Sequence, residues 1–257
     1  TMTADIGDKA LATLPEKDAA ISARTRNALS EAKARGVKLG SAGADNIRNV
    51  TGTSTAGIDP QEILDTRRYA REWHFHILND RSLYGLPRKF NVAFDGAGRI
   101  ATLEETNDIA FQAVEVADGF GVEPGIYFRL ALGGITGHKD FAQDTGVILK
   151  PNEATEVADK IVRVFIENGD RTNRNKARLK YVLDSWGFDK FLSAVEEKLG
   201  RKLARVPADA IAPRPVYDRF AHIGVHPQKQ AGLNWIGVAL KLGHLSPEQI
   251  RGLSKLS

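Results

Sequence analysis

The amino-acid sequence predicts an α+β fold, in which helices pack on one side of a mainly antiparallel mixed sheet, followed by a shorter C-terminal unit. Two observations favour this class. Strand-like segments at 88–94, 109–116 and 126–132 precede a run of helix-like segments, whereas a strict alternation of strands and helices would indicate a parallel sheet. The 257 residues are 42% hydrophobic and 26% charged, which is typical of a globular protein with a sizeable core.

The elements follow one another with recognisable boundaries. Residues 1–35 are rich in Ala, Lys, Glu and Arg, and we expect a peripheral helical segment there. Asp59 as N-cap and Pro60 at the first helical position predict the start of a helix that continues to Ile77. Three further helices are predicted because each apolar periodic stretch ends at a glycine; they cover 153–167, 175–186 and 189–199.

The remaining chain suggests a different unit. A Pro-rich connector begins at residue 201, a strand-like stretch covers 233–243, and a helix is expected to begin at Ser246. The predicted organisation is therefore a peripheral segment (1–35), an α/β unit (36–200), and a connector with an incomplete second lobe (201–257).

Composition excludes several classes of function. The chain contains no cysteine, so it holds no disulfide, no thiolate metal ligand and no cysteine nucleophile. No apolar run is long enough to span a bilayer and residues 1–9 are polar, so we expect a cytoplasmic protein that does not bind membranes. His74 and His76 are two residues apart on a predicted helix and face different directions, so no metal site is predicted.

Two stretches carry unusual concentrations of polar groups. The segment GSAGADNIRNVTG (40–52) is a glycine- and amide-rich loop with one cation, Arg48. In GDRTNRNKARLKY (169–181), Arg171, Arg174 and Arg178 fall on one face of a predicted helix, and a polyanionic ligand would relieve their repulsion. A surface loop and a solvated helix face are the simpler alternatives.

The segment LPRKFNVAF (86–94) also stands out. Its alternation places Phe90 and Val92 on one face and Lys89, Asn91 and Ala93 on the other, so a cation and an amide lie side by side with little bulk near them. Together with the two stretches above, this segment indicates a basic pocket for an anionic ligand. Nucleic acid remains an alternative, although the basic stretch lacks interleaved aromatic residues.

Four segments, in order along the chain, carry a family resemblance: ADNIRNVTG, AGIDPQEILDTR, LPRKFNVAF and GDRTNRNKARLKYVLDSWGFDKFLSAVEEKLGRKL. Together they resemble the siroheme-dependent nitrite and sulfite reductases of the assimilatory bacterial nitrite reductase type. The resemblance runs over about residues 36–257. It implies the first siroheme-domain half of such an enzyme and the start of its second ferredoxin-like lobe.

The resemblance implies which residues hold the cofactor. Siroheme carries eight carboxylates and lies between two halves of a duplicated protein. Arg88, Arg174 and Arg178 match the positions that bind these carboxylates, and arginine does so with two parallel hydrogen bonds. Gly133 and Gly134 would leave room for the ring.

The resemblance also implies a catalytic set. Arg48, Lys89 and Asn91 match residues that bind the substrate oxyanion over the siroheme iron and assist protonation of its departing oxygens. The expected reaction is the six-electron reduction of nitrite to ammonia, or of sulfite to sulfide. Sulfite reductases typically have lysine where this chain has Asn91, so one fewer cation favours singly charged nitrite.

Two departures from the family pattern shape the remaining expectations. The family's [4Fe–4S] cluster is bound by four cysteines of the second half, and this chain has none. We therefore expect an inactive fragment that needs the missing half and an electron donor such as ferredoxin, with apolar surface exposed around Phe90 or Ala93. The alternatives are a non-catalytic tetrapyrrole-binding module and an RNA-binding domain, of which nucleic-acid binding is the less expected.

Overall fold

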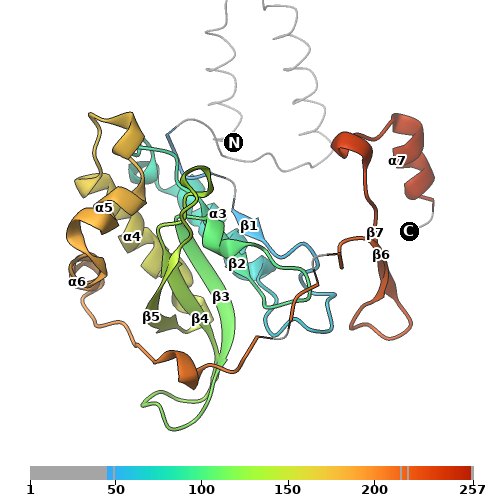
Figure 1. The fold of residues 1–257 in the computed structure, drawn as a ribbon, viewed down its shortest axis with the longest axis horizontal. Coiled ribbons are helices and arrows are strands. Elements are labelled where there is room, and N and C mark those ends of the chain that lie inside the picture. Colours follow the sequence, from blue (N-terminus) through green and yellow to red (C-terminus); the bar gives the residue numbers. More distant parts are fainter. Residues whose placement is uncertain (1–44, 49, 215, 219, 256–257) are drawn as a thin grey trace, which may run out of the picture.

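A computed structural model describes residues 45–48, 50–214, 216–218 and 220–255. The peripheral segment expected at residues 1–35 lies outside this described part. A five-stranded sheet with strand order β1-β2-β3-β4-β5 forms the centre of the fold (Figure 1). The strands are β1 (Thr51–Gly52), β2 (Val92–Asp95), β3 (Ile109–Val116), β4 (Gly125–Leu132) and β5 (Gln143–Leu149).

The sheet is mixed, as the sequence predicted. The β1–β2 and β2–β3 pairs are parallel, whereas the longer β3–β4 ladder and the β4–β5 ladder are antiparallel. All four residues of β2 are buried, because the strand lies between two parallel neighbours and is covered on both faces. The strand predicted at 88–94 had one apolar face and one face with Lys89, Asn91 and Ala93, whereas the observed strand begins at Val92 and is buried throughout.

The helices of the main unit lie on one side of the sheet (Figure 1). Aromatic side chains fill the interface: Phe111 of β3 lies between Phe94 of β2 and Phe128 of β4, with ring centroids 4.9 and 5.7 Å away. Trp73 and Phe165 close this core from the helical side and are fully buried. The helices are α3 (Arg67–Asn79), α4 (Ala154–Asn168), α5 (Leu179–Trp186) and α6 (Phe188–Leu199).

Two predicted helix starts are wrong, and side chains explain both. Asp59 does not cap a helix; its carboxylate accepts hydrogen bonds from the backbone N–H groups of Gln61 (2.9 Å) and Arg99 (2.6 Å) and so holds a loop together. Helix α5 begins at Leu179 rather than near residue 175. The Asp170 carboxylate accepts the N–H groups of Thr172 and Asn173, and the Asn173 side chain accepts that of Asn175, so these residues form turns before the helix begins. Arg171, Arg174 and Arg178 therefore do not share a helix face.

The segment 203–212, which contains a short 3-10 turn (Ala208–Ala210), covers part of the sheet face opposite the helices. Its backbone bonds to β5, with the N–H of Ile148 donating to Ala204 O and that of Val206 donating to Gly146 O, both at 3.0 Å. A second, smaller apolar cluster forms beneath it; its buried members are Val114, Val116, Tyr127, Ile148, Val206 and Ala210.

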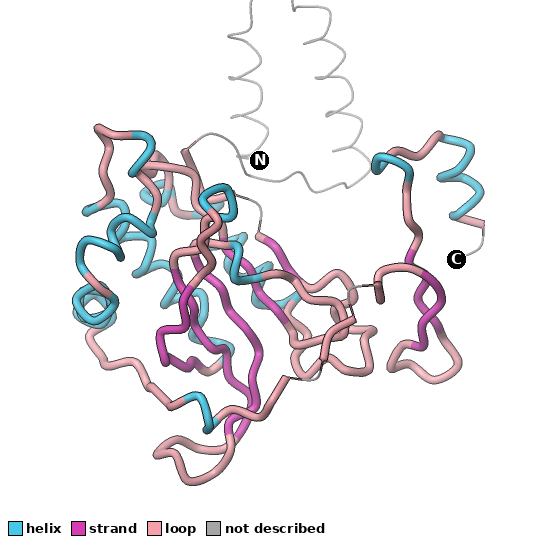
Figure 2. The backbone as a smooth tube through the Cα atoms, in the orientation of Figure 1, coloured by secondary structure: helices cyan, strands magenta, loops and turns pink. Residues whose placement is uncertain are grey.

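The C-terminal part forms a hairpin and a short helix at one side of the main unit (Figure 2). The hairpin consists of β6 (Gly224–Pro227) and β7 (Asn234–Gly237). Helix α7 (Pro247–Leu253) begins after Ser246, where a helix start was predicted, and the Ser246 side chain caps it. Many apolar side chains here are exposed, among them Val216, Phe220, Val225, Ile236 and Leu242. None of the described helices is long and apolar enough to cross a bilayer.

Candidate functional site

The loop that carries Arg48 lies beside the strand segment that carries Asn91. Ile47 forms a parallel bridge with Phe90, and the N–H of Arg48 donates to Phe90 O at 2.7 Å. Ile47 and Phe90 both point into the core. Because side chains alternate along extended backbone, Arg48 and Asn91 both point to the opposite face, where each is half-buried.

Lys89 joins this pair from the same segment. It precedes Phe90, so alternation places it on the side of Asn91, and its side chain is exposed. Lys89 forms no ion pair with any acidic residue that the structure describes. Its ammonium group is therefore available to a small anion that approaches this end of the sheet.

A buried carboxylate that the sequence did not single out connects Asn91 to Arg178. Asp108 is fully buried, and its Oδ2 accepts the N–H of Asn91 at 2.8 Å. Arg178 donates to the same carboxylate through Nε (3.1 Å) and Nη2 (2.7 Å). Burial raises the pKa of Asp108, while the guanidinium of Arg178 acts in the opposite direction.

A second carboxylate, that of Asp45, binds Arg88 and Arg174, the other two arginines predicted to hold the cofactor. Asp45 accepts hydrogen bonds from Arg174 at 2.7 and 3.2 Å, and Arg88 lies 3.5 Å from the same carboxylate. The hydrogen bond from Arg174 lowers the pKa of Asp45, which is therefore ionised at neutral pH. Arg88 and Arg174 thus share a half-buried acidic partner, Asp45, although they are far apart in the sequence, whereas Arg178 binds a different acid, Asp108.

Gly133 and Gly134 lie at the same end of the sheet, directly after β4. Their N–H groups donate to the carbonyls of Asp108 (2.9 Å) and Asn107 (3.0 Å). Gly133 has a φ of 96°, and a Cβ on Gly134 would lie 2.3 Å from the carbonyl oxygen of Glu105. Backbone packing therefore accounts for both glycines, and their role in accommodating a ring stays a prediction.

The expectation of exposed apolar surface around Phe90 or Ala93 is wrong. Both residues are fully buried, because Phe165 of α4 packs against Phe90 with ring centroids 5.3 Å apart and β1 pairs with Ala93. The exposed apolar side chains lie instead in the C-terminal part, between residues 216 and 253.

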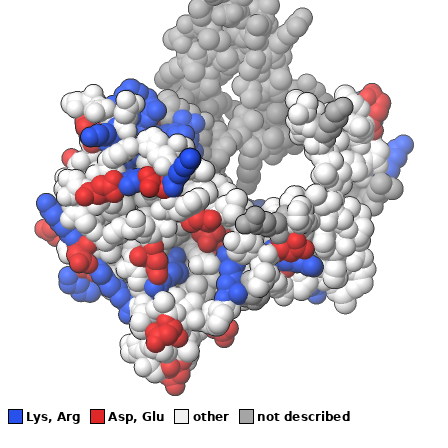
Figure 3. Space-filling model, in the orientation of Figure 1, with Lys and Arg blue, Asp and Glu red and all other residues white. Residues whose placement is uncertain are grey.

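The basic stretch 169–181 is largely neutralised within the domain. Arg174 and Arg178 bind Asp45 and Asp108, and Lys180 binds Asp184 at 2.7 Å. In Figure 3, blue side chains gather at the upper left of the view with red ones next to them. Because most of these cations are paired with acids of the same domain, this stretch does not favour RNA binding.

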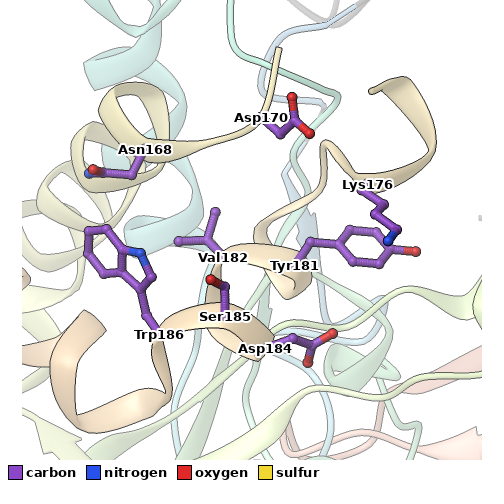
Figure 4. Close-up of a pocket in the computed structure, with 8 residues that line it drawn as sticks. All are labelled: Asn168, Asp170, Lys176, Tyr181, Val182, Asp184, Ser185 and Trp186. Atoms are coloured by element: carbon purple, nitrogen blue, oxygen red, sulfur yellow. The ribbon is translucent and has the colours of Figure 1, made fainter. Parts of the chain in front are cut away.

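A hollow of about 590 Å³ lies between α5 and the loop that follows α4. Figure 4 shows Trp186 and Tyr181 on opposite sides of Val182, with Asp170 and Asp184 at two other edges. The lining carries two carboxylates and only one cation, Lys176, so this hollow is a poor site for a ligand that is itself rich in carboxylates.

The structure also brings His76, Asp80 and Asp159 together, with potential ligand atoms within 4.8 Å of one another. Arg163 bonds both carboxylates, at 2.6 Å to Asp80 and 2.8 Å to Asp159. Its guanidinium already supplies the positive charge that a metal ion would bring. We interpret this group as an ion-pair network that joins α3 to α4.

The comparison with known protein families agrees with the motif resemblance. The family model described as "Nitrite and sulphite reductase 4Fe-4S domain" matches residues 43–203, a range that contains all the candidate site residues. The chain belongs to the nitrite and sulphite reductase family.

Individual relatives give the same result. The chain is 36% identical over 210 residues to the ferredoxin–nitrite reductase of Leptolyngbya laminosa. The matched residues cover 79% of this chain and 39% of that protein. It is 32% identical over 222 residues to a ferredoxin-type sulfite reductase of Mycolicibacterium paratuberculosis, covering 86% of this chain and 38% of that protein. The solved structure of the Mycobacterium tuberculosis NirA protein matches with a TM-score of 0.72 and 32% identity, covering 83% of this chain and 37% of that one. The chain thus spans about two fifths of the length of these relatives.

Proposed function

We propose that this chain supplies one wall of the siroheme and substrate site of a reductase that converts nitrite to ammonia. The observation that carries the proposal is the placement of Arg48, Lys89 and Asn91, which approach one face of one sheet end from two separate segments. Relatives named as ferredoxin-dependent nitrite and sulfite reductases support it. A ferredoxin donor, a second half with the cluster cysteines and a cytoplasmic location belong to the same proposal.

The donor set fits a carboxylate-rich tetrapyrrole. One edge of the Arg178 guanidinium is held by Asp108. Arg88 and Arg174 contact the half-buried Asp45, from which both side chains can turn to a ligand. These three arginines would hold siroheme carboxylates through charge-assisted hydrogen bonds. Siroheme, when bound, supplies the iron centre at which the substrate is reduced.

The chain's own residues bind the substrate and deliver protons. The Lys89 ammonium and the Arg48 guanidinium place positive charge where negative charge collects on the departing oxygen. Lys89 Nζ can donate a proton to that oxygen, whereas the Asn91 amide can donate only a hydrogen bond. Asn91 thus orients the anion without adding charge.

Nitrite fits this set better than sulfite. Nitrite is singly charged, whereas sulfite carries two negative charges when it is fully deprotonated. With asparagine at position 91, the site has one cation fewer than a site with lysine at this position. The smaller positive charge lowers the binding free energy gained by a dianion more than that gained by a monoanion. This reasoning makes nitrite the substrate of the proposed function.

A titration of the chain with siroheme tests the proposal. We expect a saturable change in the siroheme absorbance spectrum, with an affinity that falls as salt is added, because the carboxylate–arginine contacts are screened. The variant Lys198→Ala, which removes a cation on α6 paired with Glu167, is a matched control and should bind as wild type. Absence of binding by the wild-type chain would reject the proposal.

A second measurement addresses the reaction. Because the chain has no cysteine, the cluster must be held by another part of the enzyme. The chain alone should therefore show no nitrite or sulfite reduction with reduced methyl viologen. Turnover under these conditions would contradict the division of roles proposed here.

A further inference from the structure

Asp108 is a fully buried acid at the candidate site to which the mechanism above assigns no task. Its Oδ2 accepts hydrogen bonds from both the N–H of Asn91 (2.8 Å) and Nη2 of Arg178 (2.7 Å), and its Oδ1 accepts Nε of Arg178 at 3.1 Å. One carboxylate thus connects the segment leading into β2 with the N-cap of α5. The two residues that it holds are a proposed substrate contact and a proposed siroheme contact.

The backbone around Asp108 holds Asn91 from its other side as well. The N–H of Ile109 donates to the carbonyl of Asn91 at 3.1 Å, while the carbonyl of Asp108 accepts the N–H of Gly133. Both main-chain groups of Asn91 are therefore bonded to residues 108 and 109. The direction of the Asn91 side chain follows from this register.

The guanidinium of Arg178 is held along one edge. Nε and Nη2 bond Asp108, and Nη2 also lies 3.4 Å from the carbonyl of Gly134. Nη1 of Arg178 forms no hydrogen bond with any of the described residues. It is also not among the fully buried nitrogens of these residues that lack a partner, so Nη1 is exposed to solvent. Because the guanidinium is planar and rigid, fixing one edge sets the direction of Nη1.

The other two proposed siroheme arginines differ in this respect. Arg88 and Arg174 both contact Asp45, and the Arg174 side chain is 62% exposed, against 9% for Arg178. A buried ion pair is weak evidence for a contribution to stability, since well-packed apolar side chains often serve equally well. Orientation of a functional group is a better account of the pair formed by Asp108 and Arg178.

We propose that Asp108 is a positioning residue for both ligands of the site. It aims Nη1 of Arg178 at a siroheme carboxylate and fixes the main chain of Asn91 next to the substrate anion. This inference rests on the proposed function. It predicts that the loss of the Asp108 charge acts on ligand binding through Arg178 and not through general destabilisation.

The test uses two iron-free probes: uroporphyrin, which carries as many carboxylates as siroheme, and coproporphyrin, which carries half as many. Wild-type protein should prefer uroporphyrin. Asp108→Asn should weaken uroporphyrin binding about ten-fold or more and reduce this preference, since it releases a charge-assisted contact. Binding is followed by porphyrin fluorescence, and folding is checked by circular dichroism.

Asp95→Asn is the matched control. Asp95 is also fully buried, accepts Arg214 at 3.0 Å and accepts a backbone N–H, that of Ala97, at 2.6 Å. It lies at the other end of β2, about 13 Å from Asn91 along the strand. Its variant should lose stability as Asp108→Asn does, yet bind uroporphyrin as wild type.

A double-variant cycle separates positioning from a structural effect. In an Arg178→Gln background, Asp108→Asn should cause no further loss of uroporphyrin affinity, because the group through which it acts is gone. A full additional loss in that background would reject the positioning role. So would an affinity of Asp108→Asn within about two-fold of wild type.

The outcomes distinguish the two proposals. If wild-type protein binds no uroporphyrin, the proposed function fails and this inference with it; if only the Asp108 results fail, the proposed function stands. If Asp108→Asn does not fold, nitrogen-15 spectra of wild-type protein give the answer. The Nε–H of Arg178 should stay protected from exchange when uroporphyrin binds, and loss of that protection would show that the ligand displaces Asp108.

Discussion

Asp45 and Arg174 are 129 positions apart in the sequence, yet both terminal nitrogens of the Arg174 guanidinium donate to the Asp45 carboxylate, at 2.7 and 3.2 Å. The Asp45 side chain is 30% exposed and that of Arg174 is 62% exposed. An acid so placed competes with the carboxylates of an incoming ligand for the same arginine. This pair is therefore the opposite of the buried pair formed by Asp108 and Arg178.

Asp45→Asn should tighten uroporphyrin binding. The change removes a competing negative charge from beside Arg88 and Arg174, and we expect a gain of roughly three-fold, as is reasonable for an exposed ion pair. Fluorescence titration at low and high salt measures it, and the gain should shrink in high salt. Glu72→Gln, which removes the exposed partner of Arg68 on α3, is the control and should change nothing. Weaker binding by Asp45→Asn would mean that Asp45 holds the arginines in place for the ligand.

Gly134→Ala should destabilise the fold by about 2 kcal/mol or more, because the new Cβ would lie 2.3 Å from the carbonyl of Glu105 and 2.5 Å from that of Asn107. Urea denaturation measures the change in the free energy of unfolding. Gly137→Ala is the control, since no atom lies within 4 Å of its added Cβ. A variant at position 134 with wild-type stability but impaired porphyrin binding would instead support a role in leaving room for the ring.

Glu104 should make the protein less stable as the pH rises. Burial and the neighbouring Asp95 carboxylate raise the pKa of Glu104 from 4.5 to about 8. The folded state therefore keeps a proton that the unfolded state releases, so stability is full below pH 4.5 and falls until about pH 8, by an amount on the order of 5 kcal/mol. Urea denaturation across this range should show the decline. Glu104→Gln should flatten it, whereas Glu105→Gln should not.

Asp159 should govern the loss of stability in acid. Burial alone would raise its pKa, but hydrogen bonds from Arg163, His76 and Lys160 lower the pKa from 3.8 to about 2. Its stabilising contribution is thus present above pH 3.8 and is lost as the pH falls through about 2, with a magnitude of about 2 kcal/mol. Melting temperatures measured over this range should fall less steeply for Asp159→Asn than for wild type. Asp189→Asn, at a carboxylate that is 98% exposed, should retain the wild-type slope.

Asn91→Lys, made in the whole reductase that contains this sequence, should shift preference from nitrite towards sulfite. The added cation stabilises a dianion more than a monoanion, so the ratio of kcat/KM for sulfite to that for nitrite should rise about ten-fold or more. Asn91→Gln keeps the amide uncharged and is the control for a change in size. An unchanged or lower ratio in the lysine variant would show that Asn91 does not discriminate by charge.

Local sequence patterns predicted most of the regular elements. The strand predicted at 109–116 coincides with β3, and Ser246 caps α7 through a capping box with Gln249. The β5 strand was missed, because Asp144 and Gly146 interrupt its apolar pattern and its ladder with β4 contains a register shift. β1 has only two residues and owes its existence to pairing with β2, so no local pattern could reveal it.

The candidate site was predictable only in part, for a similar reason. The motifs that carry Arg48, Lys89 and Asn91 indicated a shared anion site, and the structure places Arg48 and Asn91 on one face. The acids that bind the arginines were not predictable. Asp108 lies 70 positions from Arg178, and neither charge pattern nor periodicity relates residues at such distances.

The long sequence separations at this end of the sheet have a kinetic consequence. The contacts of Asp45 with Arg174 and of Asp108 with Arg178 close chain loops of 129 and 70 residues, and the β2–β3 pair is parallel. Contacts between residues so far apart in the sequence form slowly, because the chain loses conformational entropy on closing the loops before the contacts can stabilise it. We therefore expect the basic groups to come together late in folding, so that a partly folded chain would present separate cations rather than a binding site.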